Sequence, residues 1–358
     1  PKWPFDKFVY ADKSLGTQMM ATGEVMSIGN SFEAAMMKAV SSIELGMDTL
    51  THKPFEELTD DEIVAHLHVQ DAERVFCVYE ALKRGIDHET IWKITKIDWW
   101  FLDKMQHLAD LEKGLAKCNG VLSLEQYQTA KKYGFQDKTI ERLAQVDALP
   151  VENYRAGFKM VDTCAAEFSA NTPYFYSTYD GDNEAAEFIA AREAEAAANG
   201  QPKKKKVLVF GSGPIRIGQG IEFDYCSVHC VWTLKNHGCE AILVNNNPET
   251  VSTDFDTGDR LYFDPLNPES VDNIIATEKP DACVVQFGGQ TAIKLAKHMD
   301  EIGLPILGTP ADAIDEAEDR ERFDELLERC KIPRAPGRTV FNLEEALAAA
   351  DEIGLPVL

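Results

Sequence analysis

Two glycine-rich turns are the segments of this sequence best suited to bind an anion. GSGPIRIGQG (211–220) and QFGGQT (286–291) each follow an apolar run and precede a helical pattern. Glycine lets backbone N–H groups approach an anion ahead of a helix N-terminus. Arg216 adds a cation that can bind an oxyanion through two hydrogen bonds. We expect the two turns to face each other across the strand ends. The alternative is that both segments are tight turns that bind no ligand, although a tight turn does not itself require Arg or Gln.

The first turn does not match the common nucleotide-binding loops. A dinucleotide fingerprint would need glycine where Arg216 stands, and the second strand ends in Asn245-Asn246-Asn247 instead of a ribose-binding acid. A P-loop would need Lys and then Ser or Thr after Gly218, but Gln219 and Gly220 follow. A more general anion site is therefore the hypothesis that survives.

Two carboxylates lie between the glycine turns in the sequence. Glu222 stands in GIEFDY and Glu249 in NNNPETVSTD. Aimed at one cleft, they would repel an anion and favour a neutral or protonated species. Their spacing is equally compatible with helix capping and surface charge, and that alternative stays open.

One cluster of potential metal ligands is weaker than it first looks. Cys226, His229 and Cys230 share a helical face, but structural zinc sites usually carry Cys pairs on a loop. We expect this face to pack on a sheet, with Cys as a small apolar residue and no metal bound. The sequence has no Ser/His/Asp or activated-Cys signature.

The elements that position the turns alternate between strand and helix after Lys206. This pattern predicts a doubly wound, mainly parallel α/β domain of Rossmann-like type. The expected strands are 207–210, 241–245, 261–263, 282–287 and 305–308, with helices at about 225–237, from 267 and at about 291–302. Two further helices are expected from Asp319 and from Asn342.

The part of the chain before this domain reads as helical. From about Thr59 to Val146 only helices are expected, with capping-box pairs at Thr59/Glu62 and Ser123/Gln126. The segment 83–98 repeats at 132–147 as a helix–Gly–helix unit. An earlier helix runs from Ser31 to Gly46, with Asn30 and Glu33 in capping-box spacing. Residues 182–206 suggest a partly helical linker that ends in four lysines.

Trp92 lies in the first repeated unit, and Trp99 and Trp100 follow that unit directly. They fit a core or an interface better than a cofactor site, because aromatic residues are enriched in such surfaces.

Composition excludes several classes of protein. The 358 residues carry 36 Lys and Arg against 60 Asp and Glu, a net charge of -24. So acidic a surface argues against binding nucleic acid or an anionic membrane. No apolar run reaches the roughly 18 residues of a membrane helix. The first ten residues lack a signal-peptide core and suggest the exposed end of a strand of something larger, and eight scattered cysteines suggest reduced thiols in the cytoplasm.

Several long motifs, in order, resemble the large subunits of carbamoyl-phosphate synthetases. Four segments resemble the opening of the second synthetase half of these subunits: GSGPIRIGQGIEFDYCSVH, VNNNPETVSTDFDTGDRLYF, VVQFGGQTAIKLA and AEDRERF. Earlier segments resemble the closing part of the first half's ATP-grasp module (TQMMATGEVMSIG) and the helical oligomerisation domain with its exit (IDWWFLDKMQHLADLE and YRAGFKMVDTCAAEFSANTPYFYSTYD). The resemblance covers nearly the whole chain except about 182–204.

The resemblance implies a domain order and a function. Residues 1–50 would close the first ATP-grasp module, 51–181 would be an all-α oligomerisation domain and 182–204 a linker. Residues 205–318 would be the pre-ATP-grasp α/β domain and 319–358 the start of the second ATP-grasp module. The whole protein would be an ATP-dependent ligase that makes carbamoyl phosphate from bicarbonate, ammonia and ATP with Mg²⁺. A glutaminase small subunit would supply the ammonia, and this chain alone is expected to be inactive.

The same resemblance assigns roles to residues. Arg216, Gly220, Glu222 and Glu249 would line the carbamate end of an internal tunnel, and Met19 its upstream part. Gly288, Gly289 and Gln290 would border the second phosphorylation site, and Arg320 would contact the second ATP. Met20-Ala21 and Asn30 depart from the family, which usually has Lys-Ser and Arg there; each change removes a cation near the first half's active site.

Two other classes of function stay open at this stage. One is an NAD(P)- or nucleotide-binding Rossmann enzyme, which NADH binding would favour. The other is a non-catalytic scaffold that self-associates through the helical repeat. The sequence does not distinguish arginine from pyrimidine biosynthesis as the pathway served.

Overall fold

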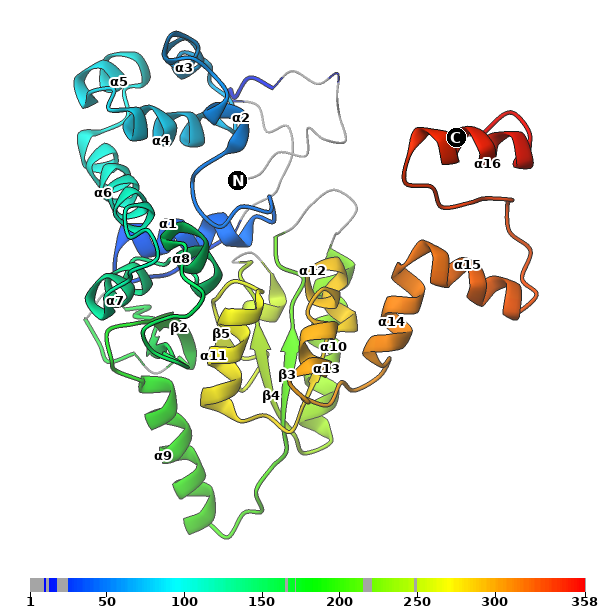
Figure 1. The fold of residues 1–358 in the computed structure, drawn as a ribbon. Helices are drawn as coiled ribbons and strands as arrows, with labels where there is room; N and C mark the ends of the chain where they lie inside the picture. Colours follow the sequence, from blue (N-terminus) through cyan, green and yellow to red (C-terminus); the bar gives the residue numbers. More distant parts are fainter. Residues whose placement is uncertain are drawn as a thin grey trace. The chain divides into compact units, whose positions relative to one another are not determined.

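The computed structural model describes residues 10, 13–17, 25–164, 167–170, 172–214, 221–247 and 250–357 (Figure 1). The chain divides into two compact units, Pro1–Leu295 and Ala296–Leu358. Each unit is described below by itself.

The first unit begins with a domain of eight helices within residues 32–144. Residues from most of these helices share one apolar core, in which Ile63, Tyr79, Leu102, Tyr127 and Ile140 are fully buried. The helices are α1 (Phe32–Ser42), α2 (Lys53–Glu56), α3 (Asp60–Leu67), α4 (Arg74–Arg84), α5 (His88–Thr95), α6 (Trp99–Ala116), α7 (Leu124–Lys132) and α8 (Asp137–Ala144).

The predicted capping boxes are confirmed at two helices and wrong at a third. Thr59 with Glu62 and Ser123 with Gln126 make both reciprocal hydrogen bonds of the motif. At α1 the cap is Ser31, whose side chain accepts from the Ala34 N–H. Asn30 instead donates from Nδ2 to Thr178 Oγ1 at 3.1 Å, so it fastens the segment before α1 to a distant strand.

The internal repeat is a structural repeat. Gly85 and Gly134 follow their helices in the left-handed region, at φ 86° and 94°. Ile91 and Ile140, at matching positions of the second helix in each unit, are fully buried. The repeat therefore fixes the same turn geometry twice and buries the same apolar position in each copy.

A six-stranded sheet follows in the order β1-β2-β5-β4-β3-β6. All neighbours are parallel except β1 and β2, and α10 packs on β3 and β4. The elements are β1 (Gly157–Met160), β2 (Tyr174–Thr178), α9 (Glu184–Ala198), β3 (Lys206–Phe210), α10 (Ile221–Asn236), β4 (Glu240–Val244), η1 (Val251–Thr253), β5 (Arg260–Tyr262), α11 (Pro268–Glu278), β6 (Ala282–Val284), η2 (Gln286–Gly288) and α12 (Gly289–Ile293).

The prediction that residues 51–181 are all-α is wrong for β1 and β2. Phe175 pairs with Tyr262 of β5, so the exit of the helical domain extends the α/β sheet. Aromatic and β-branched residues in YFYST favour a strand, and Phe158 and Phe175 are fully buried. Helix α9 lies in the expected linker and packs against β1 and α11, which makes it part of the domain rather than a free connection.

The second unit is helical in its described residues. Its helices are α13 (Ala296–Glu301), α14 (Ala311–Glu318), α15 (Arg320–Arg329) and α16 (Leu343–Ile353). Asp319 and Asn342 cap α15 and α16, close to the predicted starts. The strand expected at 305–308 is wrong: only Ile306 forms a bridge, and Pro305 has no N–H to give to a ladder. The helix expected at 291–302 is broken between Ile293 and Ala296.

A buried lysine joins the helical domain to the α/β domain. Lys131 of α7 is 1% exposed and pairs with Glu269 of α11 and with Asp137, the latter at 2.8 Å. Glu269 also accepts from the Asp137 N–H at 2.7 Å and from the Tyr179 hydroxyl at 3.3 Å. Burial alone would lower the pKa of Lys131, but Tyr179, Glu269 and Asp137 raise it, so the lysine stays charged.

Removing the charge of Glu269 should therefore loosen this junction. We expect Glu269→Gln to lower the free energy of unfolding by about 2–3 kcal/mol, because it leaves a buried ammonium with one carboxylate. Urea unfolding followed by circular dichroism measures the change. Glu187→Gln, an exposed position on α9, is the control and should change stability little. Equal changes in the free energy of unfolding of the two variants would contradict the stabilising role of the Lys131–Glu269 pair.

Candidate functional site

The two glycine turns meet at the carboxyl edge of the sheet, as predicted. A Cβ atom on Gly288 would lie 2.5 Å from the carbonyl oxygens of Phe210 and Gly211. A Cβ atom on Gly213 would lie 2.9 Å from Thr291 Cγ2. Only glycine permits so close an approach of one backbone to another. The described start of the turn after β3 therefore packs directly against the turn after β6.

A buried asparagine holds the first turn in place. Asn245 is fully buried, and its Oδ1 accepts from the N–H groups of Gly213 at 3.1 Å and Asn246 at 2.9 Å. Its Nδ2 donates to Ser252 Oγ at 3.3 Å, which ties the turn to η1. This role of Asn245 was not predicted from the sequence. Three polar residues directly after a buried strand were the signal of this role.

The second turn is shaped by Gly289 and an aromatic neighbour. Gly289 has φ 62°, and a Cβ atom added at this residue would lie 3.3 Å from the Phe223 ring. Phe223 belongs to α10, so this helix contacts the second turn while its start follows the first. Gly288, Gly289 and Gln290 thus lie together at the end of β6, as the sequence analysis expects.

The remaining predicted site residues are placed unevenly. Glu222 is exposed in the first turn of α10. Arg320 is the first residue of α15, is exposed and belongs to the second unit. Met19, Arg216, Gly220 and Glu249 lie outside the described residues, as do Met20 and Ala21. Their predicted roles stay predictions.

A segment from before the helical domain reaches the same edge of the sheet. The Met26 N–H donates to the Asn246 carbonyl at 2.9 Å. Met26 and Ile28 pack against an apolar cluster that includes Leu243 and Leu261. The sequence analysis did not predict this contact, because nothing in the local pattern of 25–30 encodes a partner more than 200 positions away.

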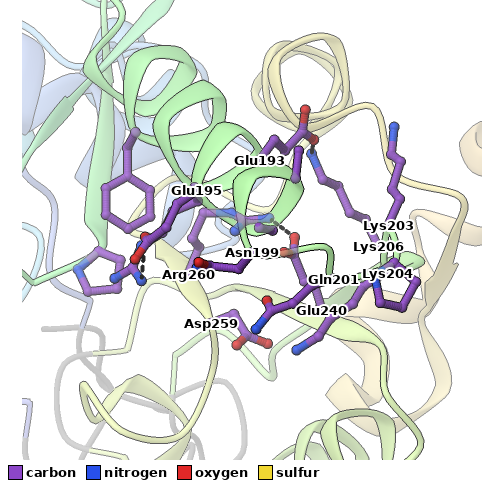
Figure 2. Close-up of a pocket in the computed structure, with 16 residues that line it drawn as sticks. Glu193, Glu195, Asn199, Gln201, Lys203, Lys204, Lys206, Glu240, Asp259 and Arg260 are labelled. Atoms are coloured by element: carbon purple, nitrogen blue, oxygen red, sulfur yellow. Dashed lines mark hydrogen bonds and ion pairs between the residues drawn. The ribbon is translucent and has the colours of Figure 1, made fainter.

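The opposite, amino edge of the sheet carries a cleft of about 630 Å³ (Figure 2). Charged side chains of its wall pair with one another: Lys206 with Glu193 at 2.9 Å, and Arg260 with Glu240 at 2.8 Å. Arg260 also binds Glu278, which is fully buried. These ion pairs connect α9 and α11 to the first residues of the strands. The charged residues of the cleft wall therefore have a structural role that needs no ligand.

The cysteines and histidines of α10 do not form a zinc site in the described residues. These residues contain no group of three or more His, Cys, Asp or Glu side chains placed to hold a metal ion. Burial raises the pKa of Cys230 to about 11, which keeps its thiol protonated near neutral pH. The expectation that this helical face packs on the sheet is wrong for Cys226 and His229, which are exposed. The His229 ring lies against the rings of Tyr225 and Trp232.

Among the helices described, none combines the length and the apolar character needed to cross a bilayer.

Two family models match the chain in tandem. The carbamoyl-phosphate synthetase large chain oligomerisation domain matches residues 24–159. The carbamoyl phosphate synthase preATP-grasp domain matches residues 203–316. The first match covers the helical domain and β1, and the second covers the glycine turns and strands β3 to β6.

Curated relatives align with the whole chain. Carbamoyl phosphate synthase large chains of Lachnoclostridium phytofermentans and Agathobacter rectalis are 52% and 53% identical, and that of Clostridium botulinum is 50% identical. Each alignment covers 100% of this chain and 33% of the relative, so the chain spans about a third of the relatives' length. A solved biotin carboxylase domain of Hydrogenobacter thermophilus 2-oxoglutarate carboxylase covers 44% of this chain and 34% of its own at 25% identity, but its TM-score of 0.33 supports no argument.

The contact between the glycine turns predicts a strong effect of one methyl group. We expect Gly288→Ala to lower the free energy of unfolding by about 1–3 kcal/mol, because the added carbon meets two carbonyl oxygens. Gly114→Ala is the matched control: it lies within α6 with open space around it and should stabilise by up to about 1 kcal/mol. Urea unfolding measures both. An unchanged free energy of unfolding in Gly288→Ala would contradict the close packing of the two turns.

Proposed function

We propose that this chain, which belongs to the carbamoyl-phosphate synthetase large-chain family, supplies three things to the complete enzyme. They are a surface for self-association, a wall of the carbamate tunnel and one face of the site where carbamate is phosphorylated. In the complete reaction, ATP phosphorylates bicarbonate to carboxyphosphate, and ammonia displaces phosphate to give carbamate. A second ATP then phosphorylates carbamate to carbamoyl phosphate.

The observation that carries this proposal is the meeting of two distant segments at one sheet edge. The glycine turns pack together there, and Met26 bonds Asn246 beside them. Carbamate and carboxyphosphate decompose in water, so their path needs walls that exclude solvent. Backbone N–H groups at the turns, with Arg216, would stabilise the charge that develops during phosphorylation.

Ligands and partners follow from the same proposal. ATP and Mg²⁺ would be held mainly by the ATP-grasp modules, with Arg320 of this chain contacting the second ATP. Ammonia would come from a glutaminase small subunit in the cytoplasm. The product would enter arginine or pyrimidine biosynthesis.

The carboxylates Glu222 and Glu249 give the tunnel proposal its test. We propose that they favour transit of neutral carbamic acid, because a carboxylate repels an anion. The complete enzyme with Glu222→Gln and Glu249→Gln should leak carbamate and hydrolyse more ATP per carbamoyl phosphate formed. Coupled assays of ADP and product measure this ratio. The control is Glu125→Gln with Glu187→Gln, two exposed positions elsewhere. An unchanged ratio in the first variant would refute the tunnel role.

An aromatic surface on the helical domain supports self-association. Trp92, Trp99 and Trp100 are 38%, 47% and 50% exposed, which argues against a place in the core and supports an interface. The ring centroids of Phe32 and Trp100 lie 5.2 Å apart in an edge-to-face arrangement. Tryptophan is enriched among the residues that dominate binding energy at interfaces.

Removing two of these rings should weaken the oligomer. We expect Trp99→Ala with Trp100→Ala to raise the dissociation constant at least about tenfold, since interface tryptophans commonly contribute more than 1.4 kcal/mol. Sedimentation equilibrium over a range of concentrations measures it. Phe168→Ala, which removes another exposed ring, is the control. Self-association that survives the double change would place the interface elsewhere.

A further inference from the structure

One buried carboxylate connects three segments that are far apart in the sequence. Asp264, which follows β5, is 1% exposed. Its Oδ1 forms an ion pair with Lys38 Nζ at 2.9 Å and accepts from Ser177 Oγ at 2.7 Å, and its Oδ2 accepts from the Ser177 N–H at 2.9 Å. Lys38 belongs to α1 and Ser177 to β2. The carboxylate is therefore shared between the α/β domain, the exit of the helical domain and the start of that domain.

The lysine of this pair also binds two backbone carbonyls. Lys38 Nζ donates to the carbonyls of Ile28 at 3.0 Å and Ser177 at 2.8 Å. The ammonium group therefore has one carboxylate and two carbonyl partners, all of them buried or half-buried. The three partners belong to three segments of the chain, so the position of the ammonium group fixes Ile28 relative to Ser177 and Asp264.

Fixing Ile28 also fixes the contact with the candidate site. Met26, two residues earlier, donates its N–H to the Asn246 carbonyl, and Asn246 is bonded through its own N–H to the Asn245 amide. The same amide holds Gly213 in the first glycine turn. Polar contacts therefore connect Lys38 to the turn, with the backbone between Ile28 and Met26 as one link of the series.

We propose that Lys38 and Asp264 are a positioning pair that aligns segment 25–30 with the glycine turns. This inference rests on the proposed function, because the alignment matters where the upstream and downstream walls of the carbamate path must join. Neither residue is placed to touch substrate. A buried ion pair is an inefficient way to gain stability, and well-packed apolar residues can replace one without loss. What apolar residues would not reproduce is the directed bond to Ile28.

The alignment can be measured in the 358-residue chain without any enzyme assay. Hydrogen exchange at the Met26 amide reports its bond to Asn246. We expect Lys38→Met to speed this exchange by about tenfold or more through local opening. Lys132→Met is the matched control, since Lys132 pairs with Asp180 at 3.3 Å but is 52% exposed. Unchanged exchange at Met26 in the Lys38 variant overturns the proposal.

A double variant separates positioning from simple stabilisation. Lys38→Met with Asp264→Leu replaces both charges by apolar groups, and we expect it to recover thermal stability relative to Lys38→Met alone. Met26 exchange should nevertheless stay fast. Recovery of protection together with stability would show that the pair only holds the fold and would overturn the positioning role.

The complete enzyme carrying this double variant tests the consequence for coupling. We expect bicarbonate-dependent ATP hydrolysis to persist while the ATP used per carbamoyl phosphate rises about threefold or more, as a misaligned path exposes carbamate to water. A normal ratio in this variant, with a raised ratio in the Glu222/Glu249 variant, overturns the positioning inference alone. A normal ratio in both overturns the tunnel proposal on which it rests.

Discussion

Backbone contact between two glycine turns is the constraint on which the candidate site depends. Gly288 sits against the carbonyls of Phe210 and Gly211, at a distance that leaves no room for a side chain. Because β3 and β6 are adjacent parallel strands, their carboxyl ends deliver both turns to one place. A ligand at this edge would meet fixed peptide dipoles, which need no rearrangement as charge develops on it.

The connections between domains use a different chemistry from the site itself. Lys131 joins the helical domain to α11 through Glu269, and Lys38 joins α1 to Asp264 after β5. Both lysines are largely buried and bonded to carboxylates on distant segments. Such pairs are directional and tolerate little displacement, unlike an apolar contact that can slide. The helical domain and the α/β sheet are therefore held in register within the first unit.

The sequence predicted local features well and distant ones poorly. The cap at Thr59, the turn at Gly85 and the start of α11 at Pro268 depend on neighbours within a few residues, and each is confirmed. The strands β1 and β2 were missed because β2 pairs with the distant strand β5, as in the pairing of Phe175 with Tyr262, and β1 in turn pairs with β2. Residues that carry the docking of 25–30, such as Lys38, have no sequence signature, since any exposed helix carries lysines.

The two edges of the sheet divide these roles between them. At the amino edge, three strands begin with Lys206, Glu240 and Arg260. Lys206 pairs with Glu193 of α9, and Arg260 pairs with Glu278 of α11 and with Glu240. At the carboxyl edge the same three strands lead into glycine, asparagine and a buried Asp264 that is already bound. Charge at the amino edge is thus paired within the fold, and the residues that follow β3 and β4 directly, Gly211 and Asn245, are uncharged. In the proposed carbamate path this uncharged backbone is the frame, because fixed peptide dipoles need no rearrangement. The charges proposed to act on the passing acid, those of Arg216, Glu222 and Glu249, come later in the segments that follow these two strands.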